Sequence, residues 1–152
     1  SLKNWRKKFP TARVCIGNHD ERVHRLASAS GIPSMYLQDY KTVYGTPNWE
    51  WEYEFEIDGV YYTHGTGTSG IRPAMGIALA RCQSTVSGHV HSVGTIHNMN
   101  GPTDKILFGF NVPNGVDRHH KVMYYGRNFL KKPVNGAGVV IDGKPYMEIM
   151  YE

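Results

Sequence analysis

Residues 13–20, Arg13-Val14-Cys15-Ile16-Gly17-Asn18-His19-Asp20, indicate the fold class most directly. The first four residues form a short, mostly apolar run that is typical of a strand, and the run ends at a glycine. Residues 20–30 then predict a helix, with Val23, Leu26 and Ala27 on one face and with a glycine and a proline beyond its end. A strand, a tight glycine turn and a helix in this order predict an α/β fold.

The strictest alternation of the chain follows in residues 49–58, where aromatic or aliphatic residues alternate with acidic ones. A period of two predicts one strand with an apolar face and an acidic face. Asp58-Gly59 predicts a two-residue hairpin turn. The expected cross-strand partners are Ile57 with Val60, Phe55 with Tyr62, and Tyr53 with His64. We therefore expect His64 on the buried face, at the end of the second strand.

The remaining segments predict further strands and one helix. Pro73 suits a first helical turn, and the small residues after it, up to residue 83, predict a helix that packs closely on a sheet. Thr85-Val86-Ser87 predicts a strand that leads into Gly88-His89-Val90-His91. Residues 105–112 and a hairpin at Asp142-Gly143 complete a single predicted domain, residues 1–152.

The composition suits an ordinary globular domain and excludes fibrous and disordered classes. The chain has 152 residues, of which 40% are hydrophobic and 20% charged. Its net charge of +4 is compatible with anionic substrates but too small to define a nucleic-acid-binding protein. Cys15 and Cys82 are expected to be buried, reduced thiols, which favours a cytoplasmic location. No apolar run approaches 18 residues, so we expect no membrane partner.

Three segments place histidine beside a glycine where a predicted strand ends: residues 17–20, His64-Gly65 and residues 88–91. Strand ends in α/β sheets are where ligands bind. An Asn carbonyl and neutral imidazoles are donors suited to Zn, Mn or Fe, and His89 and His91 would point the same way on an extended backbone. The other histidines lack this context and are expected to be solvated or structural: His24, His97, His119 and His120.

Together, Gly17-Asn18-His19-Asp20, the single His64 and Gly88-His89-Val90-His91 resemble the metallophosphoesterase (calcineurin-like phosphoesterase) family. The family signature runs Asp-x-His, Gly-Asp, Gly-Asn-His-Asp/Glu, a single His and Gly-His-x-His, and residues 12–92 contain its last three parts in order. The resemblance implies a four-layer α/β/β/α sandwich with two divalent metal ions, which would be Mn, Zn, Fe or Mg. It also implies site roles, with Asn18, His64 and His89 as ligands of the second metal, His91 as a ligand of the first and His19 as the catalytic acid.

The chain departs from the family in its first part, because neither Asp-x-His nor Gly-Asp precedes residue 17. We therefore expect it to correspond to the C-terminal half of such a domain, without the bridging aspartate. This half would bind at most one metal, and weakly. Without the upstream strands it would uncover a sheet edge and an apolar face, which favours self-association into a homo-oligomer.

The activity implied by the resemblance is hydrolysis of a phosphomonoester or phosphodiester by a metal-activated hydroxide. The substrate would be a nucleotide or nucleic acid in one interpretation. Asp20 has two interpretations, either as the catalytic partner of His19 or as an acidic first-turn residue that favours the helix dipole. The alternative function is a non-catalytic module of the same fold that binds nucleic acid or a protein partner.

Overall fold

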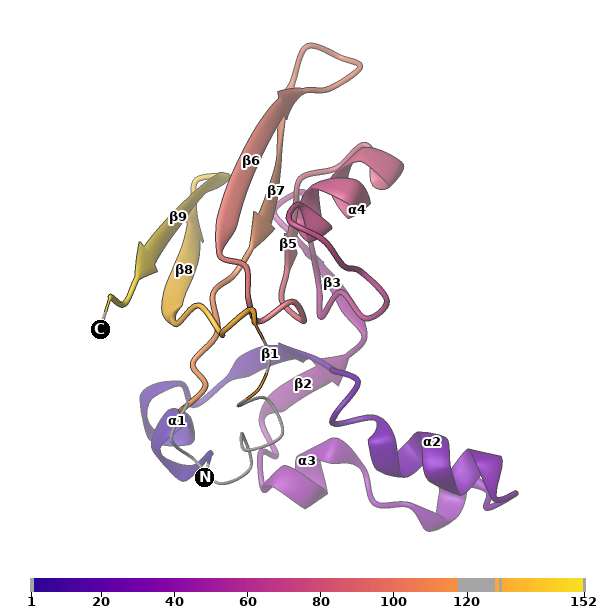
Figure 1. The fold of residues 1–152 in the computed structure, drawn as a ribbon. Coiled ribbons are helices and arrows are strands. Elements are labelled where there is room, and N and C mark those ends of the chain that lie inside the picture. The colour runs from indigo at the N-terminus through magenta and orange to yellow at the C-terminus, as the bar shows by residue number, and fades with distance from the viewer. Residues whose placement is uncertain (1, 118–127, 129, 152) are drawn as a thin grey trace. The chain divides into compact units, whose positions relative to one another are not determined.

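The computed structural model describes residues 2–117, 128 and 130–151 (Figure 1). His119 and His120 lie outside these residues. The chain is a mixed α/β protein that forms two compact units, Ser1–Phe55 and Glu56–Glu152. Among the described helices, none is long and apolar enough to cross a membrane.

The smaller unit contains the predicted strand, glycine turn and helix. Strand β1 pairs in parallel with β2, with Ala12 opposite Trp49 and Cys15 opposite Glu52. Ile16, Ala27 and Trp49 are its buried apolar residues. The elements in order are α1 (Lys3–Lys8), β1 (Ala12–Cys15), α2 (Arg22–Ala29), the 3-10 helix η1 (Ser34–Tyr36), α3 (Tyr40–Tyr44) and β2 (Trp49–Glu52).

Helix α2 buries less of its predicted apolar face than the sequence pattern indicates. Ala27 is buried, but Val23 and Leu26 are 64% and 60% exposed. The backbone N–H of Ile32 donates to the Ala27 carbonyl as the chain turns back toward η1. The segment after the helix thus turns back at Ala27, which is the buried residue of the helix.

The larger unit is organised around a five-stranded mixed sheet in the order β3-β4-β5-β7-β6. Strands β4, β5 and β7 are parallel, β6 is antiparallel to β7, and β8 and β9 form a separate hairpin. The predicted hairpin at Asp142-Gly143 and strand near residues 105–112 are confirmed. The elements are β3 (Glu54–Ile57), β4 (Val60–Thr63), α4 (Pro73–Arg81), β5 (Thr85–Ser87), β6 (Thr95–Asn100), β7 (Ile106–Asn111), β8 (Gly136–Ile141) and β9 (Lys144–Ile149).

The two faces of this sheet are covered by different elements, with α4 on one face and the β8–β9 hairpin on the other (Figure 1). Val86 and Phe110 belong to the core on the hairpin side, where Val140 and Met147 pack against them. On the other face, α4 approaches β7 so closely that a Cβ on Gly109 would lie 2.4 Å from the backbone of Met75. The prediction of a helix that packs closely on a sheet is therefore confirmed.

The alternating stretch 49–58 is two strands, and the prediction of one continuous strand is wrong. β2 pairs with β1 and β3 neighbours β4, so the hydrogen-bonding partner changes at Tyr53, which is 53% exposed at a bend. The two-residue turn is confirmed, since Asp58 and Gly59 have φ values of 52° and 74°. The expected pairing of Tyr53 with His64 lies beyond the ends of both β3 and β4.

The two cysteines have different environments. Cys15 on β1 is half-buried, and burial, with a smaller effect of Glu54, raises the pKa of its thiol to about 11. Cys82 is exposed, and the prediction of burial is wrong for it. It follows the last residue of α4 in the left-handed conformation, with φ 50°, where the chain leaves the helix at the surface.

Candidate metal centre

The structure brings two of the predicted ligands, His64 and His89, side by side in the larger unit. His64 Nε2 lies 3.3 Å from His89 Nδ1, and the two rings are 5.2 Å apart at 70°. His64 directly follows β4, and His89 follows β5 after one glycine. Because β4 and β5 are parallel neighbours, their carboxyl ends meet at the same sheet edge, and the topology places both imidazoles there.

The backbone at His89 is a turn, and the prediction that residues 89–91 are extended is wrong. His89 has φ 66°, in the left-handed region, which histidine tolerates better than most residues. The Gly88 N–H donates to the His64 carbonyl at 3.2 Å, and the Val90 N–H donates to the Gly88 carbonyl at 2.8 Å. The position of the His89 ring beside His64 therefore depends on this turn and not on strand alternation.

His91 lies in the same loop and is half-buried. Its carbonyl accepts the Val134 N–H at 2.8 Å and the Asn114 side-chain amide at 2.8 Å. These two bonds fix the backbone of His91 relative to the segment that precedes β8. In the part of the chain that the structure describes, no group of three or more His, Cys, Asp or Glu residues is arranged to bind a metal.

The His64–His89 pair has the chemistry and spacing of two ligands to one divalent metal. Zn²⁺ binds imidazole nitrogens at about 2.0–2.1 Å. Two ring nitrogens 3.3 Å apart can both lie at that distance from one ion. Imidazole is a donor that Zn, Fe and similar first-row ions prefer.

Asn18, His19 and Asp20 lie in a tight turn of the smaller unit, between β1 and α2. The Gly17 N–H donates to Asp20 Oδ2 at 3.0 Å, and the Glu21 N–H donates to the Gly17 carbonyl at 2.9 Å. These bonds close the turn and leave Asn18 half-buried and His19 exposed. The predicted site residues are therefore divided, with three in this turn and three in the larger unit.

Asp20 uses both carboxylate oxygens within the smaller unit. Oδ1 accepts the Tyr44 hydroxyl at 2.8 Å, while Oδ2 accepts the Gly17 N–H. Burial, together with this hydrogen bond, raises the pKa of Tyr44 to about 12, and the Tyr44 ring stacks on Trp51 at 4.8 Å. Helix α2 begins only at Arg22, so the interpretation of Asp20 as a first-turn residue is wrong. Its proposed partnership with His19 stays a prediction.

Three residues that support the candidate site were not predicted from the sequence: Tyr44, which binds Asp20, and Asn111 and Asn114, which bind the histidine loop. Asn111 is the last residue of an apolar strand and Asn114 lies three residues beyond it, in the run Phe110-Asn111-Val112-Pro113-Asn114. Polar residues at the carboxyl end of a buried strand could have indicated that these two asparagines support the site. Tyr44 had no such signal, because its contact with Asp20 depends on how α3 folds back.

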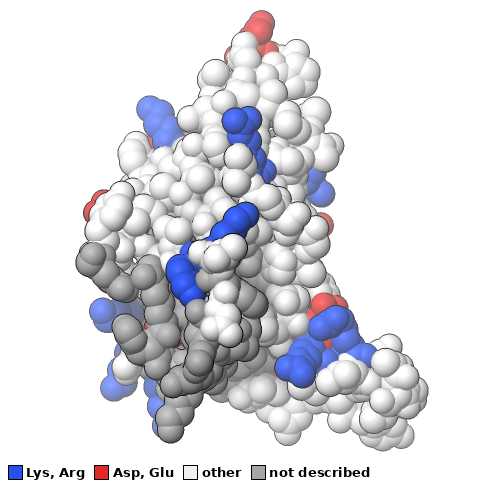
Figure 2. Space-filling view, viewed as in Figure 1, with Lys and Arg blue, Asp and Glu red and all other residues white. Residues whose placement is uncertain are grey.

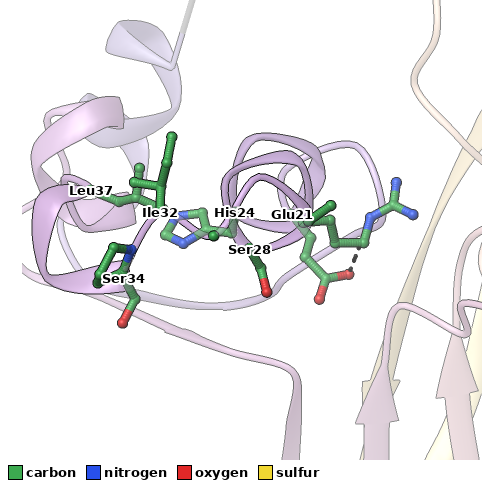
Figure 3. Close-up of a pocket in the computed structure, with 10 residues that line it drawn as sticks. Glu21, His24, Ser28, Ile32, Ser34 and Leu37 are labelled. Carbon is green, nitrogen blue, oxygen red and sulfur yellow. Dashed lines mark ion pairs between the residues drawn. The ribbon is translucent and has the colours of Figure 1, made fainter.

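A separate groove of about 680 Å³ lies in the smaller unit beside α2 (Figure 3). Its lining includes His24 and Ser28 from the helix and the apolar Ile32 and Leu37 from the segment that follows. Glu21 and Arg25 form a 4.0 Å ion pair at its side. None of the predicted ligands lines this groove.

A scan against protein-family models found no matching family. Searches of the curated proteins and of the solved structures also found no match.

Proposed function

We propose that this chain supplies ligands of a divalent metal centre in a metal-dependent phosphoester hydrolase. The observation that carries the proposal is the approach of His64 Nε2 to His89 Nδ1, 3.3 Å apart at the carboxyl ends of two parallel strands. The Gly-Asn-His-Asp and Gly-His-x-His motifs around the candidate residues support it. The α4, five-stranded-sheet and β8–β9 layers of the larger unit are compatible with three layers of an α/β/β/α sandwich.

In this proposal, His64 and His89 of the larger unit bind one ion, and His91 contributes to a second. The ions would be Mn, Zn, Fe or Mg, and when bound they supply a hydroxide nucleophile and neutralise phosphoryl charge. His19 has the exposure that a general acid needs to reach a leaving oxygen. Asp20 contributes by closing the turn that carries His19.

The proposed substrate class is a phosphomonoester or phosphodiester, with nucleotides or nucleic acid included because the chain is basic. Figure 2 shows Lys and Arg side chains separated by uncharged surface on the described part of the larger unit that is in view. A scattered distribution of this kind gives more support to a short anionic substrate than to a long duplex, which requires many phosphate contacts.

Zinc titration of the 152-residue chain tests the metal centre. We expect at most one Zn²⁺ per chain by calorimetry, with binding lost in His64→Ala and in His89→Ala. His24→Ala is the matched control, because His24 lies on α2 in the other unit and is expected to leave binding unchanged. Equal binding by all four proteins would contradict the proposal.

Hydrolysis of a generic phosphodiester, measured with Mn²⁺ or Zn²⁺ present, tests the role of His19. We expect His19→Ala to keep the metal content and to lower turnover by about 10²–10⁴-fold, the usual contribution of a general acid. With a single bound ion the basal rate is expected to be low. Loss of metal in His19→Ala would show that His19 is a ligand.

A non-catalytic module that binds nucleic acid or a protein partner is the second candidate function, and the net charge of +4 is compatible with it. Binding of a fluorescent oligonucleotide in the presence of EDTA, with no hydrolysis when metal is added, would support this candidate. Metal-dependent hydrolysis that His89→Ala removes would exclude it.

A further inference from the structure

Asn111, the last residue of β7, is completely buried beneath the loop that carries the candidate histidines. Its side-chain amide donates to the Val93 carbonyl at 2.6 Å and to the Val90 carbonyl at 3.4 Å. Val90 is the residue between His89 and His91. One buried carboxamide therefore binds the loop backbone at two points.

A second asparagine acts on the same loop three residues further along the chain. The Asn114 amide donates to the His91 carbonyl at 2.8 Å and to the Val134 carbonyl at 2.9 Å. Together, Asn111 and Asn114 bind the carbonyls of residues 90, 91 and 93. The left-handed turn at His89 directly precedes these three positions.

The carboxamide of Asn111 has partners for its N–H groups and none for its oxygen. Among the described residues, the Asn111 side-chain oxygen, Ser87 Oγ and Thr95 Oγ1 are buried without hydrogen-bond partners. The strand register places Ser87 and Thr95 opposite Asn111 on its two neighbouring strands. An unpaired buried oxygen costs stability, whereas the two N–H donors of Asn111 satisfy loop carbonyls that an apolar residue would leave without these donors. The two N–H donors of the same carboxamide bind the carbonyls of Val90 and Val93.

We infer that Asn111 is a positioning residue for the histidine pair. By binding the carbonyls of Val90 and Val93, it fixes the turn that brings His89 beside His64, and Asn114 fixes His91 in the same way. The effect on metal binding rests on the proposed function, whereas the effect on the loop does not. Groups that orient metal ligands from outside the first shell typically change metal affinity by about 10–100-fold when they are removed.

Asn111→Leu tests the inference, because leucine has a similar shape but no donors. Gln83→Met is the matched control, since the Gln83 amide also donates to a backbone carbonyl, that of Gly59, at the opposite end of the strands. Three quantities are measured on the 152-residue chain: Zn²⁺ affinity, the visible absorption of bound Co²⁺, and amide hydrogen exchange of residues 88–93 in EDTA. Asn111→Ser replaces Asn111→Leu if the leucine variant does not fold.

We expect Asn111→Leu to lower Zn²⁺ affinity by about 10–100-fold, to change the Co²⁺ spectrum and to accelerate exchange in residues 88–93. Gln83→Met should change none of these. If Asn111 has a purely structural role, Asn111→Leu lowers the thermal midpoint but leaves the Zn²⁺ affinity unchanged when it is measured at temperatures well below that midpoint. This result would overturn the inference. If the wild type and His89→Ala bind Zn²⁺ equally, the proposed metal centre fails, and exchange in EDTA still decides the role of Asn111. Unchanged exchange would overturn that role, and faster exchange would support it.

Discussion

Asp20 shows at the scale of one residue how a motif can have a structural function that its spacing does not reveal. One of its oxygens accepts the Gly17 N–H and closes the turn, and the other accepts the Tyr44 hydroxyl and links the turn to α3. The exposed His19 is carried by this turn. Any catalytic use of His19 would therefore depend on the hydrogen bonds of its neighbour.

Tyr44→Phe removes one of these two bonds and should lower the free energy of unfolding by about 0.5–1.5 kcal/mol. Urea denaturation monitored by tryptophan fluorescence measures the change. Tyr53→Phe is the matched control, because its hydroxyl donates to Glu21 at a longer 3.2 Å from an exposed position. A larger loss in Tyr53→Phe than in Tyr44→Phe would contradict the assigned role of Tyr44.

The thiols should differ in reactivity. Burial raises the pKa of Cys15 to about 11, so almost none of it is thiolate at pH 8, whereas Cys82 is exposed. We expect a thiol reagent to modify one cysteine rapidly at pH 8, and Cys82→Ser to abolish this phase while Cys15→Ser retains it. Rapid modification that persists in Cys82→Ser would contradict the burial of Cys15.

The raised pKa of Cys15 also affects the stability of the folded chain above neutral pH. The folded chain keeps the Cys15 proton up to about pH 11, whereas an ordinary thiol of the unfolded chain loses it near pH 9.0. The folded state therefore binds more protons between these values, and its stability should fall as pH rises through this window. Cys15→Ser should reduce that dependence in denaturation curves measured from pH 8 to pH 11.

At the scale of elements, the contact between α4 and β7 depends on a glycine. A Cβ at position 109 would lie 2.4 Å from the Met75 backbone, whereas one at Gly76, on α4 itself, would meet nothing within 4 Å. We expect Gly109→Ala to destabilise the protein by about 1–3 kcal/mol through overpacking. Gly76→Ala should stabilise it by about 0.5–1 kcal/mol, because alanine is the better helix former. Thermal unfolding of both variants measures the difference, and equal effects would contradict this packing.

Elements that are specified by local signals could be predicted from the sequence. The turns at Asp58-Gly59 and Asp142-Gly143 and the helix that begins at Pro73 depend on residues that favour particular backbone angles, and they form as expected. The division of residues 49–57 between two sheets could not be predicted. Side-chain alternation continues through the bend at Tyr53, and the period of two carries no information about which strand is the partner.

The candidate site, like the fold, could be predicted only in part from the sequence. His64 and His89 were expected at strand ends, and their ring nitrogens lie 3.3 Å apart, but the parallel pairing of β4 with β5 that brings them together was not predicted. The left-handed turn at His89 was not predictable, because hydrogen bonds from Asn111 and Asn114, more than 18 residues away, accompany it. Exposure of Val23 and Leu26 was missed because periodicity shows which residues share a helix face but not what covers that face.

At the scale of the whole molecule, a bound metal should stabilise the folded chain by mass action. An ion that binds only the folded state at 100 times its dissociation constant adds about 2.7 kcal/mol. We therefore expect Zn²⁺ to raise the thermal midpoint of the wild type and EDTA to reverse the increase. His89→Ala should abolish the shift, whereas His97→Ala, on β6, should retain it. A shift of equal size in His89→Ala would place the ion elsewhere.

The order of strands in the larger sheet also sets the sequence in which its parts can form. The two-residue turn between β3 and β4 closes the shortest loop, and hairpins of this kind form in microseconds. Pairing of β4 with β5 must close a longer loop that contains α4, and its entropic cost makes it slower. We therefore expect His64 to reach the end of a strand early and His89 to join it only when the parallel pairing is complete. Recovery of Zn²⁺ binding during refolding would then report the time at which this crossover closes.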